Sequence, residues 1–183
     1  MILQILGASG TGKSTLGSAL ASEMGFPLLR SDHYLWPNEE FDVPRPVQER
    51  RRMLQEDIDR FPSFILDGGI SWFFPQTLFP DWIVLLRCPA QTRMERLHRR
   101  ETQRFGNWQD PRHPHHQITR EFLKWAAGYE TAGEEESNSL CAHMKLLADA
   151  RCPALILWSD EDLDGLVRRI LDAVQWEKNA ADF

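Results

Sequence analysis

The sequence predicts an α/β fold in which a parallel sheet carries helices on both faces. Five short apolar runs alternate along the chain with segments of helical composition. Most of these runs are continuously apolar, which is typical of strands buried on both sides. A glycine-rich segment also lies between the first run and the first helix, as in folds that bind ligands at the edge of such a sheet.

The elements follow one another in a regular order. The first strand is predicted over residues 2–6, and a helix over residues 15–24 ends at Gly25. Further strands are predicted at residues 26–30, 63–67, 81–88 and 153–158. Further helices are predicted at residues 47–60, 91–104, 118–129, 139–150 and 163–176. No repeat or linker divides the 183 residues, so we expect a single domain over residues 1–183.

Composition is that of a globular protein, with 42% hydrophobic and 26% charged residues. Three widely spaced cysteines (Cys88, Cys141 and Cys152) suit a reducing compartment, and the apolar run over residues 1–6 is too short for a signal sequence or a membrane span. We therefore expect a cytoplasmic protein without a membrane partner. The sequence is silent on oligomeric state.

Charge is unevenly distributed within a net charge of −6. Residues 87–120 contain eight arginines and three carboxylates, for a net charge of +5, and the rest of the chain carries −11. A basic segment in an acidic body suits a local anion site better than an extended nucleic-acid surface. The alternative is a solvated helix face.

Residues 7–14, GASGTGKS, match the pattern G-x-x-x-x-G-K-[ST] between a predicted strand and a predicted helix. Glycines let successive backbone N–H groups point at phosphate oxygens, and the N-terminus of the helix adds positive potential. Lys13 is placed to reach the β- and γ-phosphates, and the Ser14 hydroxyl to ligate Mg²⁺. The sequence therefore predicts a nucleotide phosphate site.

The additional Gly10 and Thr15 make GASGTGKST resemble the loop of small P-loop kinases, such as shikimate, gluconate and nucleoside monophosphate kinases. The resemblance implies a three-layer P-loop NTPase fold, a five-stranded sheet of order 2-3-1-4-5, and a mobile lid at about residues 93–120. It also implies ATP and Mg²⁺. The residues expected to hold the nucleotide are Gly7, Ala8, Ser9, Gly10, Thr11, Gly12, Lys13, Ser14 and Thr15, with Arg104 from the lid.

An acidic side chain follows the second predicted strand in RSDHYLW. Kinases of the gluconate and shikimate type often have a D-x-D pair here; Asp32 matches its second position, and Arg30 stands at the first. A carboxylate facing the γ-phosphate can orient an acceptor hydroxyl and take its proton, so Asp32 is predicted to bind the acceptor and to act in catalysis. The alternative is a helix or turn cap.

The third predicted strand ends in LDGG, residues 66–69. Asp67 is predicted to hold the water shell of Mg²⁺ together with Ser14, and Gly68 and Gly69 to let the acceptor approach the backbone. A plain turn is the alternative. The aromatic residues that follow, Trp72, Phe73 and Phe74, are expected either to wall an acceptor pocket or to belong to the core.

Arginines recur on one face of the helix predicted at residues 91–104. In the kinases that the chain resembles, lid arginines neutralise charge on the transferred group. Arg96 and Arg100 are the predicted catalytic residues of this face, which begins at Arg93 and ends at Arg104. Three histidines, at positions 113, 115 and 116, are expected in a mobile lid loop; a metal site is the less favoured alternative.

Transfer of the γ-phosphoryl group of ATP to a hydroxyl of a small molecule is the function that these features favour. A regulatory ATPase without a metabolite acceptor remains open, because the D-x-D pair is incomplete at Arg30. A kinase acting on nucleic-acid ends is less favoured, since the net charge is −6.

Overall fold

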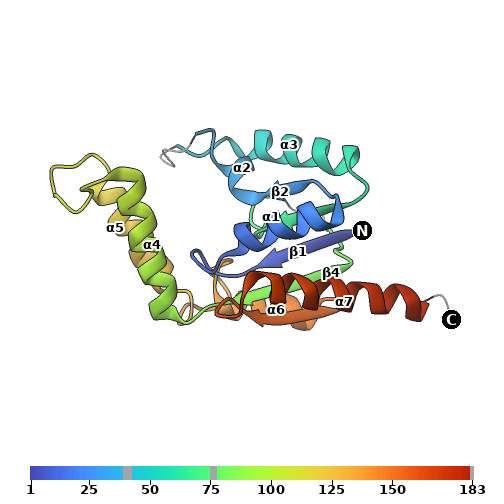
Figure 1. Ribbon diagram of the computed structural model, residues 1–183. Coiled ribbons are helices and arrows are strands. Elements are labelled where there is room, and N and C mark those ends of the chain that lie inside the picture. The colour runs from blue at the N-terminus through green and yellow to red at the C-terminus, as the bar shows by residue number, and fades with distance from the viewer. Residues whose placement is uncertain (39–42, 75–77, 182–183) are drawn as a thin grey trace.

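The computed structural model describes residues 1–38, 43–74 and 78–181. Five parallel strands form one sheet in the order β2-β3-β1-β4-β5 (Figure 1). The strands are β1 (Ile2–Leu6), β2 (Leu28–Arg30), β3 (Phe64–Asp67), β4 (Trp82–Arg87) and β5 (Ala154–Trp158). The predicted fold class and strand order are confirmed.

Side chains of the strands alternate between the two faces of the sheet, and both faces are covered. On one face, Leu3 and Ile5 of β1 pack with helices α1 (Lys13–Met24) and α7 (Leu163–Ala181). On the other face, Leu66 of β3 packs with α3 (Val47–Arg60), and Leu6 of β1 with α6 (Leu140–Asp149). Covering both faces explains why the strands are continuously apolar.

A short helix, α2 (Ser31–Leu35), follows β2 directly and was not predicted from the sequence. Five residues are too few to show a helical periodicity. Its Tyr34 is buried against the core that includes Leu54 and Phe64, and its hydroxyl donates to Asp57 Oδ2 at 2.7 Å. This packing holds α2 at the end of β2, so the first turn of the helix, with Asp32, lies at the edge of the sheet.

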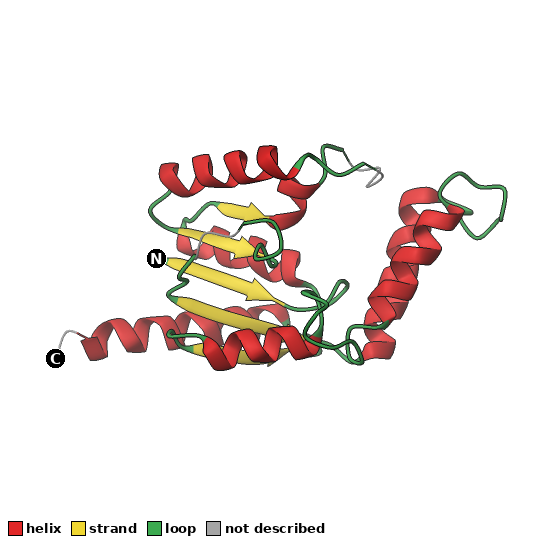
Figure 2. Cartoon of the chain, turned by 180° about the vertical axis from the view of Figure 1, so that it is seen from behind, coloured by secondary structure: helices red, strands yellow, loops and turns green. Residues whose placement is uncertain are grey.

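Helices α4 (Ala90–Phe105) and α5 (His116–Ala127) form a helical hairpin that stands away from the sheet (Figures 1 and 2). They pack together through their own cluster, which contains Leu97, Trp108 and Leu123. The predicted lid at about residues 93–120 falls within this hairpin. We use the name helical hairpin for residues 90–127 below.

Because all five strands are parallel, their carboxyl ends lie at one edge of the sheet. The N-terminus of α1, residues 31–35 of α2 and the base of the helical hairpin follow strands β1, β2 and β4 at this edge. No helix within residues 1–38, 43–74 or 78–181 is long and apolar enough to cross a membrane.

Candidate functional site

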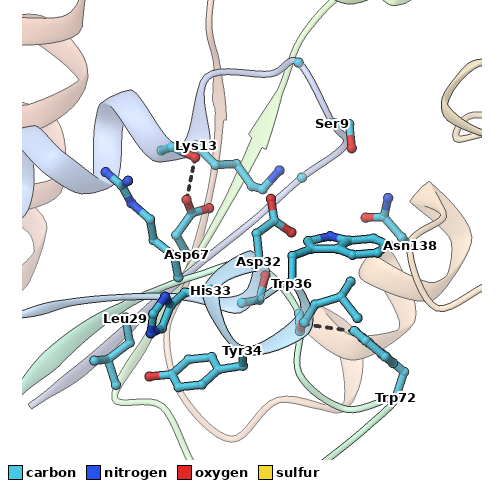
Figure 3. Close-up of a pocket in the computed structure, with 18 of the residues that line it drawn as sticks. Ser9, Lys13, Leu29, Asp32, His33, Tyr34, Trp36, Asp67, Trp72 and Asn138 are labelled. Atoms are coloured by element: carbon cyan, nitrogen blue, oxygen red, sulfur yellow. Dashed lines mark hydrogen bonds between the residues drawn. The ribbon is translucent and has the colours of Figure 1, made fainter. Parts of the chain in front are cut away.

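A cavity of about 1330 Å³ lies at the carboxyl edge of the strands (Figure 3). Residues from the loop after β1, from the ends of β2 and β3, from the helical hairpin and from residues 136–138 line it. Open α/β sheets bind their ligands at this edge. The cavity therefore brings together segments that are far apart in the sequence.

The loop between β1 and α1 has the backbone shape that its glycines predict. Gly7 has a φ of 145° and Gly10 a φ of 84°, both in the region that favours glycine. A Cβ atom at Gly7 would lie 2.3 Å from the Leu86 carbonyl oxygen, and one at Gly10 would lie 2.9 Å from the Arg93 carbonyl oxygen. The loop is thus pressed against β4 and α4, and neither glycine has room for a side chain.

Lys13 begins α1 and folds back over this loop. Its ammonium group donates to the Ala8 carbonyl oxygen at 2.9 Å. In Figure 3 the ammonium group and the Asp32 carboxylate point toward one another. Lys13 therefore lies between the phosphate loop and the Asp32 side chain at the end of β2.

Ser14 and Asp67 are joined across the site, since the Ser14 hydroxyl donates to Asp67 Oδ2 at 2.6 Å. Asp67 ends β3 and is buried, whereas Ser14 is exposed in the first turn of α1. A hydroxyl and a carboxylate in contact are the oxygen ligands that Mg²⁺ prefers. This pair fits a Mg²⁺ ion with its water shell, and the predicted role of the two residues in holding that ion stays a prediction.

Electrostatics at the centre of the site favour neutral groups. Desolvation by burial lowers the pKa of Lys13, while the carboxylates of Asp67 and Asp32 act to raise it. Asp32 is partly open to solvent, yet desolvation raises its pKa above the ordinary value of 3.8, against the opposing effect of Lys13. A carboxylate with a raised pKa is a stronger proton acceptor when ionised, which suits a general base.

The predicted acceptor-binding glycines differ in their surroundings. Gly68 has a φ of 103°, and its carbonyl oxygen accepts a hydrogen bond from the buried Gln4 amide at 3.0 Å. Gly69 lines the cavity with nothing within 4 Å of where a Cβ would stand. Both glycines lie on the cavity wall next to Asp67, and their role in binding an acceptor stays a prediction.

Arg30 occupies the first position of the expected acidic pair and lines the cavity as well. Its guanidinium donates to the Ser18 hydroxyl of α1 at 3.0 Å. No carboxylate replaces it in the sequence, so Asp67 is the buried acidic side chain next to Ser14. The structure thus has one carboxylate, that of Asp67, next to Ser14 despite the departure at Arg30.

The arginine side chains of α4 lie in different surroundings and do not all face the cavity. Arg100 and Arg104 line the cavity, and the Arg100 guanidinium stacks 5.4 Å from the centre of the Phe122 ring. Arg96 instead donates to the Ser159 hydroxyl at 3.0 Å and the Thr11 carbonyl oxygen at 3.4 Å. This arrangement does not bring Arg96 to the cavity, because loop oxygens hold its guanidinium, and its catalytic role stays a prediction.

The aromatic run after β3 divides between the two roles that the sequence left open. Phe73 and Phe74 are buried in the core that contains Leu54. Trp72 is 45% exposed and lines the cavity, and its indole N–H donates to the Gly69 carbonyl oxygen at 3.3 Å. One of the three aromatic residues therefore belongs to the pocket.

Sequence reasoning missed several residues of the cavity wall. They come from α2 and its end, from α3, from α5 and from the segment before α6, and include Tyr34, Trp36, Asn38, Asp57, Trp125, Glu136, Ser137 and Asn138. Tyr34 and Trp36 lie close in sequence to the predicted site residue Asp32. The others have no motif, because the fold alone brings them to this edge.

The histidines of the loop between α4 and α5 take part in local contacts. His115 stacks on Phe105 with ring centres 4.1 Å apart, and His116 Nδ1 lies 3.1 Å from the Trp108 carbonyl oxygen. Within the described part of the chain no group of three or more histidine, cysteine, aspartate or glutamate side chains could hold a metal ion. The metal alternative for these histidines thus has no support among the residues described.

Known proteins resemble this chain in sequence and in fold. A family model described as an AAA domain matches residues 4–110. Uncharacterized protein YqaC of Bacillus subtilis (strain 168) is 36% identical over 171 residues, which cover 93% of this chain and 95% of that protein. An adenylate kinase isoenzyme 6 homolog of Caenorhabditis elegans is 31% identical over 105 residues, which cover 52% of this chain and 57% of that protein.

A solved structure of deoxyadenosine kinase from M. mycoides, with dCMP and dCDP bound, superposes with a TM-score of 0.58 at 12% identity. The superposition covers 96% of this chain and 99% of that one. At this level of identity the likeness shows a shared fold.

Proposed function

The chain belongs to the AAA domain family, and on that premise we propose that it is an ATP-dependent phosphotransferase acting on a hydroxyl of a small molecule. The observation that carries the proposal is the convergence of Lys13, Asp32 and the hydrogen-bonded pair of Ser14 and Asp67 at one cavity. A phosphate loop alone would hold a nucleotide. The facing Asp32 carboxylate adds a group that can receive a proton from an acceptor.

Each residue has a defined role in the proposed reaction. The N–H groups of the loop at residues 7–15 and the Lys13 ammonium bind the phosphates, and Ser14 and Asp67 would hold Mg²⁺, which neutralises phosphate charge. Asp32 accepts the proton of the acceptor hydroxyl. The hydroxyl oxygen forms a bond to the γ-phosphorus, the bond from that phosphorus to the β–γ bridging oxygen breaks, and ADP leaves.

Closure of the helical hairpin completes the site in this proposal. Arg100 and Arg104 line the cavity from α4, and movement of the hairpin would bring their guanidinium groups to the transferred phosphoryl group. Removal of water at closure also favours transfer to the acceptor over hydrolysis. We therefore assign the lid to the hairpin, with Arg100 and Arg104 as its phosphate-binding residues.

Cavity size and the named relatives support two substrates. Pockets for a single small ligand measure roughly 300–1,000 Å³, and this cavity measures about 1330 Å³. The adenylate kinase homolog and the deoxyadenosine kinase are named for phosphoryl transfer to acceptors. The cysteines Cys88, Cys141 and Cys152 suit the reducing cytoplasm, where we place this activity.

The variant Asp32→Asn tests the proposal. It keeps the size of the side chain and removes the carboxylate, so we expect acceptor-dependent ADP release to fall by at least about 100-fold, with binding of a non-hydrolysable ATP analogue unchanged. Coupled ADP assays and calorimetric titration measure the two quantities. Asp172→Asn, on an exposed position of α7, is the matched control. Equal turnover by Asp32→Asn would refute the assignment of Asp32.

Arg30 favours a second candidate, a regulatory ATPase that transfers no phosphate to a metabolite. Release of ADP by the wild-type protein, measured with and without hydroxyl compounds, distinguishes the two. Hydrolysis that no acceptor accelerates would support the ATPase. Phosphorylation of a 5′-hydroxyl oligonucleotide at low salt would instead support the nucleic-acid-end kinase, against which the net charge of −6 argues.

A further inference from the structure

The acceptor side of the cavity has the chemistry of a site for a planar ring. Resting on the phosphotransferase function proposed above, we propose that the acceptor is a hydroxyl compound that carries an aromatic ring and no phosphate or carboxylate group. Three observations carry this inference: the indoles of the cavity wall, the distribution of charge along it, and the polar side chains between the indoles.

Three tryptophans from separate parts of the chain line the same cavity. Trp36 follows α2, Trp72 follows β3, and Trp125 lies on α5. Trp72 is 45% exposed and Trp125 is 43% exposed, so both indoles keep large apolar surfaces accessible to solvent. Indole faces that line a pocket stack on planar rings, and burying them on binding is favourable.

Polar and aromatic contacts fix the position of the Trp72 side chain although it is not buried in the core. The Arg50 guanidinium lies 5.2 Å from the centre of the indole, and the indole N–H is bonded to the Gly69 carbonyl oxygen at 3.3 Å. Phe73 packs edge-on against it, with ring centres 4.8 Å apart. The side chain is therefore fixed while much of its surface stays accessible, as a preorganised binding surface requires.

Charge is separated within the cavity. The cationic side chains among its lining residues are Lys13, Arg30, Arg100 and Arg104, which lie on the phosphate loop's helix, at the end of β2 and on α4. On the acceptor side, at residues 33–38, 57, 68–72 and 136–138, the lining residues described include no lysine or arginine. The carboxylates there belong to Asp57 and Glu136, and Asp57 accepts a hydrogen bond from the Tyr34 hydroxyl.

An acceptor with a phosphate or carboxylate group would thus meet carboxylates on this side without a matched guanidinium or ammonium from the described residues. Burying an unpaired anion is unfavourable, and like charges raise the cost further. A neutral ring avoids both costs. The wall therefore selects against sugar acids and nucleoside monophosphates.

Polar side chains near the indoles suit the edge of a heteroaromatic ring. Figure 3 shows Trp36, Trp72 and Asn138 on one side of Asp32 and Asp67 on the other. The Asn138 amide can both donate and accept hydrogen bonds. A ring between these groups would leave its attached hydroxyl facing Asp32, in the direction of the phosphate loop.

Calorimetric titration tests the inference with the full chain saturated by a non-hydrolysable ATP analogue, which keeps ring compounds out of the nucleotide position. Adenosine, thymidine and pyridoxine are the neutral ring probes, and gluconate, shikimate and AMP are the anionic ones. We expect at least one ring probe to bind at least tenfold more tightly than every anionic probe. Tighter binding of an anionic probe, or no binding of any ring probe, would overturn the inference.

Variants of Trp72 provide a second test of the proposed aromatic acceptor. Trp72→Leu keeps an apolar side chain without a ring, so it should weaken the best ring probe by about tenfold, and Trp72→Phe should restore much of the loss. Binding of the ATP analogue should not change in either. Phe79→Leu, at a position 71% exposed, is the aromatic control outside the cavity wall. Equal binding by Trp72→Leu and the wild type would contradict the role of the ring.

This test is separate from that of the phosphotransferase function. Acceptor-dependent ADP release with gluconate or shikimate would leave phosphoryl transfer intact and overturn the aromatic acceptor. Loss of all acceptor dependence would overturn both.

Discussion

At the scale of single residues, the site is organised around Asp32, Lys13 and the pair of Ser14 and Asp67. Asp32 is held in the first turn of α2, where desolvation raises its pKa and Lys13 opposes that rise. A carboxylate that is poorly solvated when ionised lowers the stability of the folded state. Functional sites often contain such groups because the same environment makes them reactive. Asp32 should therefore be favourable for turnover and unfavourable for folding.

The pH dependence of stability tests whether ionised Asp32 destabilises the folded protein. The pKa of Asp32 is higher in the folded state than in the unfolded state. The folded wild type is therefore destabilised as the pH rises through this folded-state pKa and Asp32 ionises, and it is not destabilised at a pH low enough to keep Asp32 protonated. Asp32→Asn should thus have a higher Tm than the wild type at pH 7.5, with a smaller difference at pH 4. Scanning calorimetry without nucleotide measures both. A difference that grows as the pH falls would contradict the sign.

At the scale of elements, Arg93 joins the two helices of the helical hairpin at the end next to the sheet. This arginine is fully buried where α4 passes the phosphate loop. Its guanidinium donates to the Ala126 carbonyl oxygen at 2.8 Å and to Glu130 Oε2 at 2.8 Å, and lies 5.5 Å from the centre of the Tyr129 ring. One side chain therefore ties α4 to the end of α5, beside the loop that holds the phosphates.

Removing this link should destabilise the protein. Arg93→Met leaves the Glu130 carboxylate and the Ala126 carbonyl oxygen without their donor, which we expect to lower the free energy of unfolding by about 2–3 kcal/mol. Arg99→Met, on an exposed position of the same helix, should change it by less than about 0.5 kcal/mol. Urea unfolding of both variants measures the difference. Similar losses in the two variants would mean that Arg93 is not the link.

At the scale of the whole molecule, the sheet with its covering helices forms one body and the helical hairpin projects from it (Figure 2). The cavity is lined from both, by the phosphate loop on the sheet and by Arg100 and Arg104 on the hairpin. Ligand phosphates between the two would attract the arginines toward Lys13. The shape of the molecule is therefore expected to depend on the nucleotide.

Small-angle X-ray scattering tests this expectation. A saturating non-hydrolysable ATP analogue with Mg²⁺ should lower the radius of gyration, because the hairpin closes over the cavity. The variant Arg100→Gln/Arg104→Gln should bind the analogue and show a smaller change. An unchanged radius in the wild type would mean that closure does not follow from nucleotide binding alone.

Much of the fold followed from local sequence. The apolar runs predicted five strands of a covered parallel sheet, which the structure confirms. The glycine spacing of residues 7–14 predicted a phosphate loop, and Gly7, Gly10 and Gly12 have positive φ values there. The short helix α2 was missed because five residues carry no periodicity. The arginines of α4 were predicted as one face, whereas Arg93 is buried, Arg96 is bound to Ser159, and only Arg100 and Arg104 line the cavity.

The sequence by itself determined that a nucleotide phosphate is the expected ligand and that Asp32 and Asp67 lie at the ends of two predicted strands, because loop shape and strand ends depend on residues close together in the chain. Tertiary structure alone decided that Trp36, Trp72 and Trp125 line one cavity, and it brought the predicted partners Ser14 and Asp67, 53 residues apart, into direct contact. Such contacts depend on how strands and helices pack at one edge of the sheet, and no local pattern of residues encodes them.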